Sequence, residues 1–78
     1  MKLEKLYKIG EVMQHTGLSR QTIHNYTVAG LIFEKTRTPS GHRYYDEGVF
    51  KRLEQIKILQ HKNYTLIQIK KILEHQQN

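Results

Sequence analysis

Hydrophobic positions near the start of the chain recur at the spacing of a short helix. Ile9, Val12 and Met13 stand three and four residues apart, which places their side chains on one face of a helical turn. Gly17 follows, and glycine commonly closes a helix in the left-handed conformation. The pattern therefore predicts an amphipathic helix that ends just before Gly17.

A second short helix is predicted directly afterwards. Ser19 is a favourable N-cap, and Gly30 can end the segment. Its inward face would be formed by Leu18, Ile23 and Tyr26. Its opposite face would carry Arg20, Gln21, His24 and Thr27. Two short helices joined through a glycine-containing turn indicate a helix-turn-helix over about residues 8–29.

Residues 31–45 change in character and predict a β-hairpin. An apolar, β-compatible run at 31–33 is followed by the turn sequence TPSG and by the aromatic strand sequence HRYY. Tyr44 and Tyr45 should point to opposite sides of their strand, so one packs on the core and the other stays free. The hairpin tip is basic, with Glu34 as its single acid beside Lys35, Arg37, His42 and Arg43.

Two further helices are predicted at about 47–61 and 66–75. Asp46 is a suitable N-cap for the first, and Thr65 with Gln68 forms a capping box for the second. Apolar residues recur at helical spacing in both segments. The order helix, helix, hairpin, helix, helix describes a mainly α, single small domain.

Charge indicates the kind of partner. The 78 residues include 13 Lys and Arg against 7 Asp and Glu, a formal charge of +6. So strong a positive field on a small domain favours an anionic partner, although the same charge also serves plain solubility. The chain has no cysteine and no apolar run long enough to cross a bilayer, which is typical of a cytoplasmic protein without a membrane partner.

Catalytic and metal chemistry have little support. The acidic residues occur singly or at a helix start, and the five histidines form no H-x-x-x-H pair that would predict a metal site. No glycine-rich phosphate-binding motif is present, and no base stands ready to activate a serine. We therefore expect a protein that is not an enzyme and needs no cofactor.

Recognition of nucleic acid fits the remaining polar residues. A short helix from Ser19 to about residue 29 matches the width of the DNA major groove. Arg20 and Gln21 lie in its first turn and can pair with guanine and adenine through two hydrogen bonds each. The alternative is that Arg20, Gln21 and His24 are ordinary solvated residues, and that Tyr26 is a core aromatic whose hydroxyl reaches the surface.

The motifs together resemble the DNA-binding domain of MerR-type transcription regulators, in this order along nearly the whole chain: IGEV, TGLS, T-I-x-x-Y, GLI, GHRYY, L-x-x-I and YTLIQIKKIL. The resemblance implies a winged helix-turn-helix that binds double-stranded DNA. Its second helix would enter the major groove, the hairpin would be a first wing, and the turn at 61–64 a second. The helix spacing adds Gln21 to the DNA-binding residues that the resemblance implies. The full set would be Arg20, Gln21, Thr22, His24, Tyr26, Arg37, His42, Arg43, Tyr45, Lys62 and Asn63.

Several positions depart from the family pattern. The family usually has arginine where His24 stands, an aromatic residue at Asn25, an acid at Thr27 and a proline near Glu34. Family regulators bind palindromic DNA as homodimers and distort the promoter. Because no long helix follows Leu73, we expect this chain alone to be a monomer in solution.

Two other functions stay open at this stage. One is an excisionase-like or recombinase-associated architectural DNA binder with the same fold. The other is a protein-interaction module whose basic surface meets an acidic partner.

Overall fold

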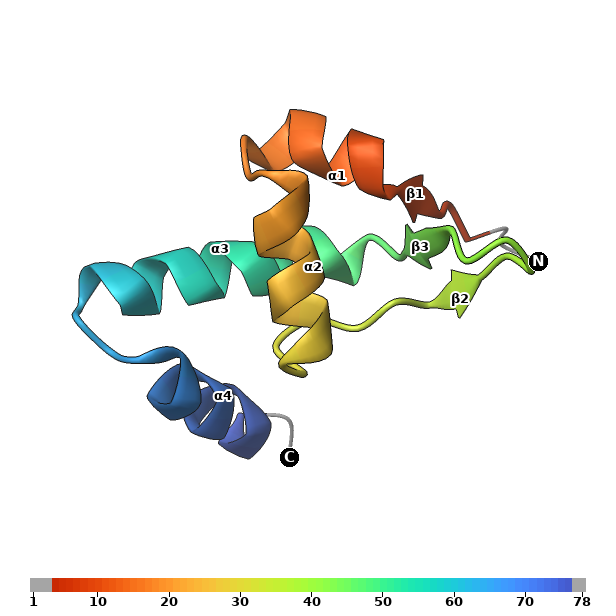
Figure 1. The fold of residues 1–78 in the computed structure, drawn as a ribbon. Coiled ribbons are helices and arrows are strands. Elements are labelled where there is room, and N and C mark those ends of the chain that lie inside the picture. Colours follow the sequence, from red (N-terminus) through yellow and green to blue (C-terminus); the bar gives the residue numbers. More distant parts are fainter. Residues whose placement is uncertain (1–3, 77–78) are drawn as a thin grey trace.

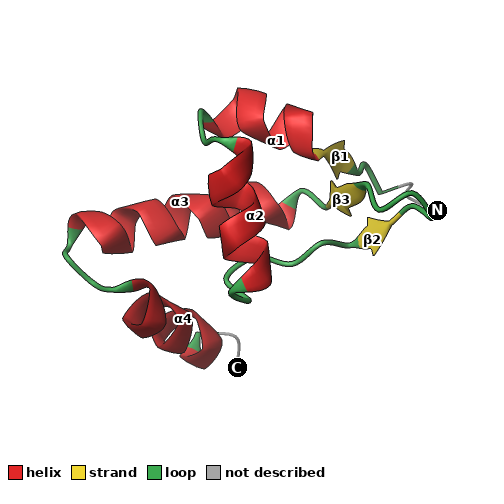
Figure 2. Cartoon of the chain, in the orientation of Figure 1, coloured by secondary structure: helices red, strands yellow, loops and turns green. Residues whose placement is uncertain are grey.

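The structure, a computed structural model, describes residues 4–76. Four helices appear in the predicted order (Figures 1 and 2): α1 Ile9–Thr16, α2 Arg20–Val28, α3 Gly48–His61 and α4 Leu66–His75. Three short strands complete this part of the chain: β1 Tyr7–Lys8, β2 Thr36–Arg37 and β3 Arg43–Tyr45. Helices α1 and α2 form the helix-turn-helix, and α2 crosses in front of α3 in Figure 1.

The turn between α1 and α2 forms as the sequence predicts. Gly17 has a φ of 74°, and its N–H donates to the carbonyl of Met13 at 2.8 Å. A left-handed φ is inexpensive for glycine, so the chain can leave α1 without a steric penalty. Two residues later, Ser19 Oγ accepts a hydrogen bond from the N–H of Thr22 at 3.1 Å and caps α2.

The sheet has three antiparallel strands in the order β1-β3-β2. Tyr7 pairs with Tyr45, and Thr36 pairs with Tyr44. Strand β1 was not predicted, because two residues are too few to show an alternating pattern. It leads directly into α1 and thereby ties the start of the helix-turn-helix to the hairpin strand β3.

The prediction that the hairpin begins at residues 31–33 is wrong. The N–H groups of Leu31 and Ile32 both donate to the carbonyl of Tyr26, at 2.9 and 3.3 Å, so the backbone is still turning out of α2. Both side chains are buried, at 1% exposure each. Hairpin pairing starts only where the N–H of Lys35 donates to the carbonyl of Tyr44. The apolar run at this point serves the core and not the sheet.

Helices α3 and α4 form a second pair, with α4 folded back below α3 in Figure 1. The N-cap of α3 is Glu47 and not Asp46 as predicted, but Asp46 Oδ1 accepts from the N–H of Gly48 at 3.0 Å and so still stabilises the start of the helix. The predicted capping box is present, with Gln68 N–H to Thr65 Oγ1 at 3.2 Å and Thr65 N–H to Gln68 Oε1 at 2.9 Å. Asn63 adopts a φ of 68° in the turn between the two helices.

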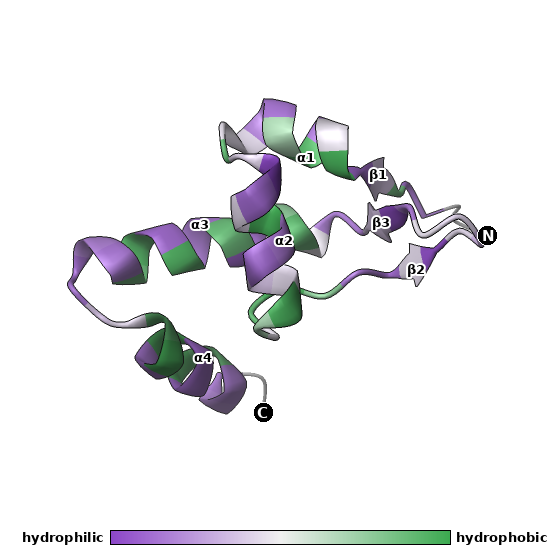
Figure 3. Ribbon diagram, viewed as in Figure 1, coloured by the Kyte–Doolittle hydropathy of each residue, from purple (hydrophilic) through white to green (hydrophobic). Residues whose placement is uncertain are grey.

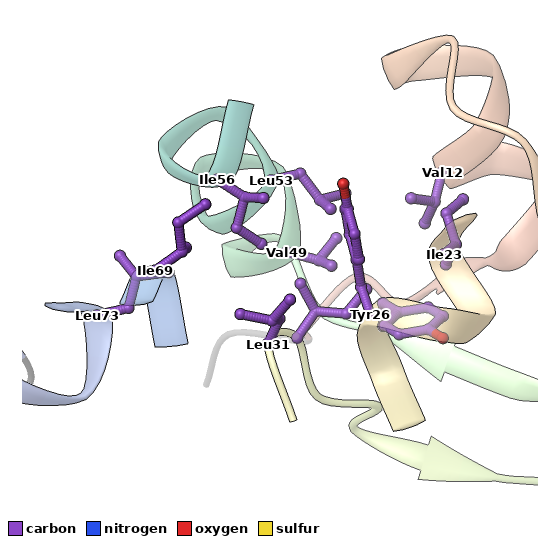
Figure 4. Close-up of a cluster of buried hydrophobic side chains, with 11 residues drawn as sticks. Val12, Ile23, Tyr26, Leu31, Val49, Leu53, Ile56, Ile69 and Leu73 are labelled. Carbon is purple, nitrogen blue, oxygen red and sulfur yellow. The ribbon is translucent and has the colours of Figure 1, made fainter. Parts of the chain in front are cut away.

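One apolar core joins all four helices and the hairpin, and Figure 4 shows most of its side chains converging from different elements. Ile23 and Tyr26 enter from α2, as the helical spacing predicted. Tyr45 enters from β3 and is completely buried. The other members are Val12, Leu31, Ile32, Val49, Leu53, Ile56, Ile69 and Leu73.

Candidate nucleic-acid interface

The face of α2 that points away from the core is polar. Arg20, Gln21 and His24 are exposed, whereas Ile23 and Tyr26, on the other face of the same helix, are buried. Figure 3 shows much of α2 in the hydrophilic colour, with a hydrophobic stretch at its lower end. The exposed face of α2 is therefore available to a partner over most of its length.

Some of these polar groups are already engaged within the helix. Gln21 Nε2 donates to Asn25 Oδ1 at 2.9 Å, and the hydroxyl oxygens of Thr22 and Ser19 are 2.9 Å apart. Thr22 is half-buried beside the N-cap. The guanidinium of Arg20, by contrast, has no hydrogen bond or ion pair within residues 4–76. Arg20 is thus the most readily available cation of α2.

The hairpin contacts α2 through Arg43. Arg43 Nη1 lies 2.8 Å from His24 Nδ1, and Arg43 Nε lies 3.5 Å from Glu34 Oε1. The Arg43 side chain is only 18% exposed. Its guanidinium therefore links α2 to the hairpin through Nη1 and Nε, while Nη2 has no hydrogen-bond partner within residues 4–76.

The other basic groups of the hairpin differ in how strongly they are bound by neighbouring side chains. Arg37 makes two hydrogen bonds to Glu34, at 2.8 and 2.6 Å, and these bonds hold the pKa of that carboxyl below its ordinary value. Lys35 Nζ lies 3.8 Å from Glu4 Oε2, an exposed and weak ion pair. His42 is exposed, with Nδ1 3.4 Å from Ser40 Oγ. Glu34 thus contacts both Arg37 and Arg43; only the Glu34–Arg37 spacing of three residues could have been seen in the sequence.

A groove of about 640 Å³ lies where α1, α2 and the hairpin meet. Charged or titratable side chains line it from three parts of the chain: Lys8 and the acidic Glu11 at the start of α1, Arg20 from α2, and His42 and Arg43 from the hairpin. The start of α2 and the basic hairpin therefore face one common space. Gln14 lines the groove as well. Neither Lys8 nor Gln14 was among the residues predicted from the sequence to bind DNA.

Two aromatic residues expected to contact DNA are core residues. Tyr45 is 0% exposed and its hydroxyl lies 2.8 Å from Thr27 Oγ1, so the prediction that Tyr45 contacts DNA is wrong. The sequence could not decide which of Tyr44 and Tyr45 packs inward, and the structure assigns the core position to Tyr45. Tyr26 is 8% exposed, and its hydroxyl donates to Gln60 Oε1 at 3.3 Å. This hydroxyl is directed towards α3, which agrees with the alternative interpretation of Tyr26 as a core aromatic.

The turn between α3 and α4 carries the remaining predicted residues. Lys62 and Asn63 are both exposed. In Figure 1 this turn lies at one end of the molecule, the hairpin at the other, and α2 between them. The left-handed Asn63 also has a structural role, because its N–H donates to the carbonyl of Gln60 and helps to end α3.

Within residues 4–76, no three histidine or acidic side chains come together as a metal site would require. No helix in the same part of the chain has the length and apolar character needed to cross a membrane.

Comparison with known proteins identifies relatives along nearly the whole chain. The model of the MerR HTH family regulatory proteins matches residues 7–76. Nodulation protein NolA of Bradyrhizobium diazoefficiens is 37% identical over 68 residues, covering 87% of this chain and 29% of NolA. The mercuric resistance operon regulatory protein of Bacillus cereus is 39% identical over 67 residues, covering 86% of this chain and 51% of that protein. The chain thus spans about half, or less, of these relatives.

Solved structures agree with the fold. The crystal structure of MtaN, the N-terminus of the Bacillus subtilis multidrug transporter activator, has a TM-score of 0.81 at 30% identity, covering 88% of this chain and 65% of that one. The HTH-type transcriptional regulator SkgA from Caulobacter crescentus has a TM-score of 0.72 at 26% identity, covering 87% and 49%. The predicted winged helix-turn-helix fold is confirmed. This chain belongs to the MerR helix-turn-helix family and forms a DNA-binding domain of that family.

Proposed function

We propose that this domain recognises a specific sequence in double-stranded DNA, with α2 in the major groove and the basic hairpin along the flanking backbone. The observation that carries the proposal is the groove lined jointly by Lys8, Arg20, His42 and Arg43. It brings the start of the candidate recognition helix and the hairpin to one side of the molecule, as simultaneous contact with one duplex requires. The formal charge of +6 supplies the attraction to phosphate.

The role that we propose for each residue follows from its exposure and from the hydrogen-bond donors that the protein leaves free. Arg20 has its five N–H donors available in the first turn of α2, and it would read a base edge or bind a phosphate beside it. Gln21 would reach a base only by exchanging its bond to Asn25. Lys8 and His42 would meet the backbone from either side of the groove. Lys62 and Asn63 would contact a more distant phosphate from the turn between α3 and α4.

For the longer regulators in which this domain occurs, we propose binding as a homodimer to palindromic DNA in the cytoplasm, at the bacterial nucleoid. One domain would occupy each half-site. Control of transcription would come from distortion of the promoter, a deformation that costs several kcal/mol and must be offset by contacts such as those of the hairpin.

Selection of bound sites from random duplexes tests the proposal directly. We expect one enriched half-site. A plot of log K for this site against log salt concentration should be a falling straight line, with a slope of about −0.9 for each phosphate neutralised. A domain that binds heparin and an acidic protein as tightly as any duplex, with no enriched sequence, would contradict it. That outcome would favour the basic protein-interaction module instead.

A further inference from the structure

The hydrogen bond between Arg43 and His24 fixes the chemistry of the imidazole. Arg43 Nη1 lies 2.8 Å from His24 Nδ1. A guanidinium has only donors, so Nδ1 must be the acceptor in this pair. A neutral imidazole that accepts at Nδ1 carries its proton on Nε2. The contact is therefore compatible with one tautomer of His24 and excludes the other.

Arg43 also has an ion-pair partner on the hairpin, and its strand is joined to α2 at a second point. Its Nε lies 3.5 Å from Glu34 Oε1, and Glu34 is in turn bound twice by Arg37. Two residues further along β3, the hydroxyl of Tyr45 lies 2.8 Å from Thr27 Oγ1 on α2. His24 and Thr27 are one helical turn apart, so strand and helix are joined at two successive points. The direction from which Arg43 approaches His24 is consequently fixed by the fold.

The other nitrogen of His24 is free to act outside the protein. His24 is exposed, and its Nε2 has no hydrogen-bond partner within residues 4–76. With the proton held on Nε2, this exposed position of α2 can offer a donor and no acceptor to a partner. An unrestrained imidazole could present either, because the two neutral tautomers exchange.

We propose that Arg43 is a positioning residue that locks His24 in the Nε2–H tautomer, and that His24 uses this N–H to read the N7 acceptor of a purine in the major groove. The inference rests on the proposed function. N7 is the acceptor that both purines present there. Guanine O6 and thymine O4 also accept, whereas the amino groups of adenine and cytosine are donors and would be rejected. The lock thereby restricts His24 to acceptor groups, and the scan with 7-deazapurines separates N7 from the other acceptors.

The first test needs no DNA. Nitrogen-15 NMR of the free domain near pH 8 measures which imidazole nitrogen of His24 carries the proton. We expect essentially pure Nε2–H in the wild type, a mixture of tautomers in Arg43→Met, and partial recovery in Arg43→Lys, because lysine also donates. Equal tautomer populations in all three proteins would overturn the lock. Circular dichroism melting confirms that each variant compared is folded.

The second test uses duplexes of the selected site with a single 7-deazaguanine or 7-deazaadenine at each purine in turn. Replacing N7 by C–H should weaken wild-type binding at one position by about threefold to tenfold, the effect of one hydrogen bond. His24→Ala should lose that sensitivity, and Arg43→Met should reduce it in proportion to the Nε2–H population that remains. A scan without any sensitive purine would overturn the N7 assignment.

His24→Gln supplies the matched control. A glutamine amide donates without help from a tautomer lock, so Arg43→Met in that background should leave the sensitivity to 7-deazapurine unchanged. Loss of sensitivity in the double variant would overturn the proposal, because Arg43 would then act on DNA directly or on the whole helix. If site selection finds no duplex preference while NMR shows the lock, the proposed function fails and the tautomer assignment stands.

Discussion

The phenolic oxygen of Tyr45 lies 2.8 Å from the hydroxyl oxygen of Thr27, which joins β3 to α2 inside the molecule. Tyr45 is completely buried, and Thr27 Oγ1 also donates to the carbonyl of Ile23. On the same face of β3, Arg43 reaches His24, one turn earlier on α2. We infer that hairpin and recognition helix approach DNA as one rigid unit.

Removing the Tyr45 hydroxyl should affect stability and not DNA contact. Tyr45→Phe keeps the buried ring and loses one hydrogen bond, so we expect unfolding free energy to fall by about 0.5–1.5 kcal/mol. The salt dependence of DNA binding should not change, because a buried residue neutralises no phosphate. Tyr44→Phe, on the half-exposed neighbour, is the control and should leave stability nearly unaltered. Chemical denaturation and a salt titration of each variant check both statements.

Arg20 should matter for DNA and hardly at all for folding. Arg20→Ala removes an exposed guanidinium that has no partner within residues 4–76, so stability should change by less than about 0.5 kcal/mol. Affinity for the selected duplex should fall by about 1–3 kcal/mol, with relaxed preference at one base position. Lys71→Ala removes the same charge from α4 and serves as the control. Equal loss on every sequence would assign Arg20 to the backbone.

Glu34 should make the hairpin sensitive to acid. The hydrogen bonds from Arg37, with the charges of Arg37 and Arg43, outweigh burial and lower the pKa of Glu34 in the folded protein. A depressed folded-state pKa gives stability that is fully present above the unfolded value, about 4.3, and is lost as pH falls through the folded value.

Because Glu34 is only half-buried and Arg37 is exposed, solvent screens the pair, and the stabilisation at neutral pH should be below about 1 kcal/mol. The stability difference between wild type and Glu34→Gln should therefore shrink as pH drops from about 5 towards 3. Glu47→Gln is the matched variant, since Glu47 makes no ion pair within residues 4–76. Urea denaturation across this pH range measures the effect. A difference that does not vary with pH would contradict the assigned role of the Glu34 charge.

Gly17 should be sensitive to substitution for conformational reasons alone. A Cβ at this position would meet nothing within 4 Å, so the only obstacle is the φ of 74°. Gly17→Ala should cost about 1–2 kcal/mol, the penalty of a left-handed residue with a side chain. Gly17→Asn should cost less, because asparagine tolerates this region. Thermal unfolding distinguishes the two, and equal costs would point to a steric cause instead.

The amino-acid sequence by itself determined the four helices and several of their caps, and its resemblance to MerR-type regulators implied the winged helix-turn-helix. The helices and caps depend on residues three or four apart, such as Ser19 with Thr22 and Thr65 with Gln68, whose geometry is set by the helix alone. The basic character of α2 and the hairpin was equally visible, because charge needs no folding to be counted.

Only the tertiary structure decided which polar groups are free. Arg43 and His24 are nineteen residues apart, and their pairing depends on the packing of β3 against α2. The same packing buries Tyr45 and not Tyr44. Leu31 and Ile32 are buried in the core and do not join the predicted strand. Strand β1 forms because Tyr7 and Lys8 pair with β3. Such outcomes follow from contacts between distant segments, which local periodicity does not encode.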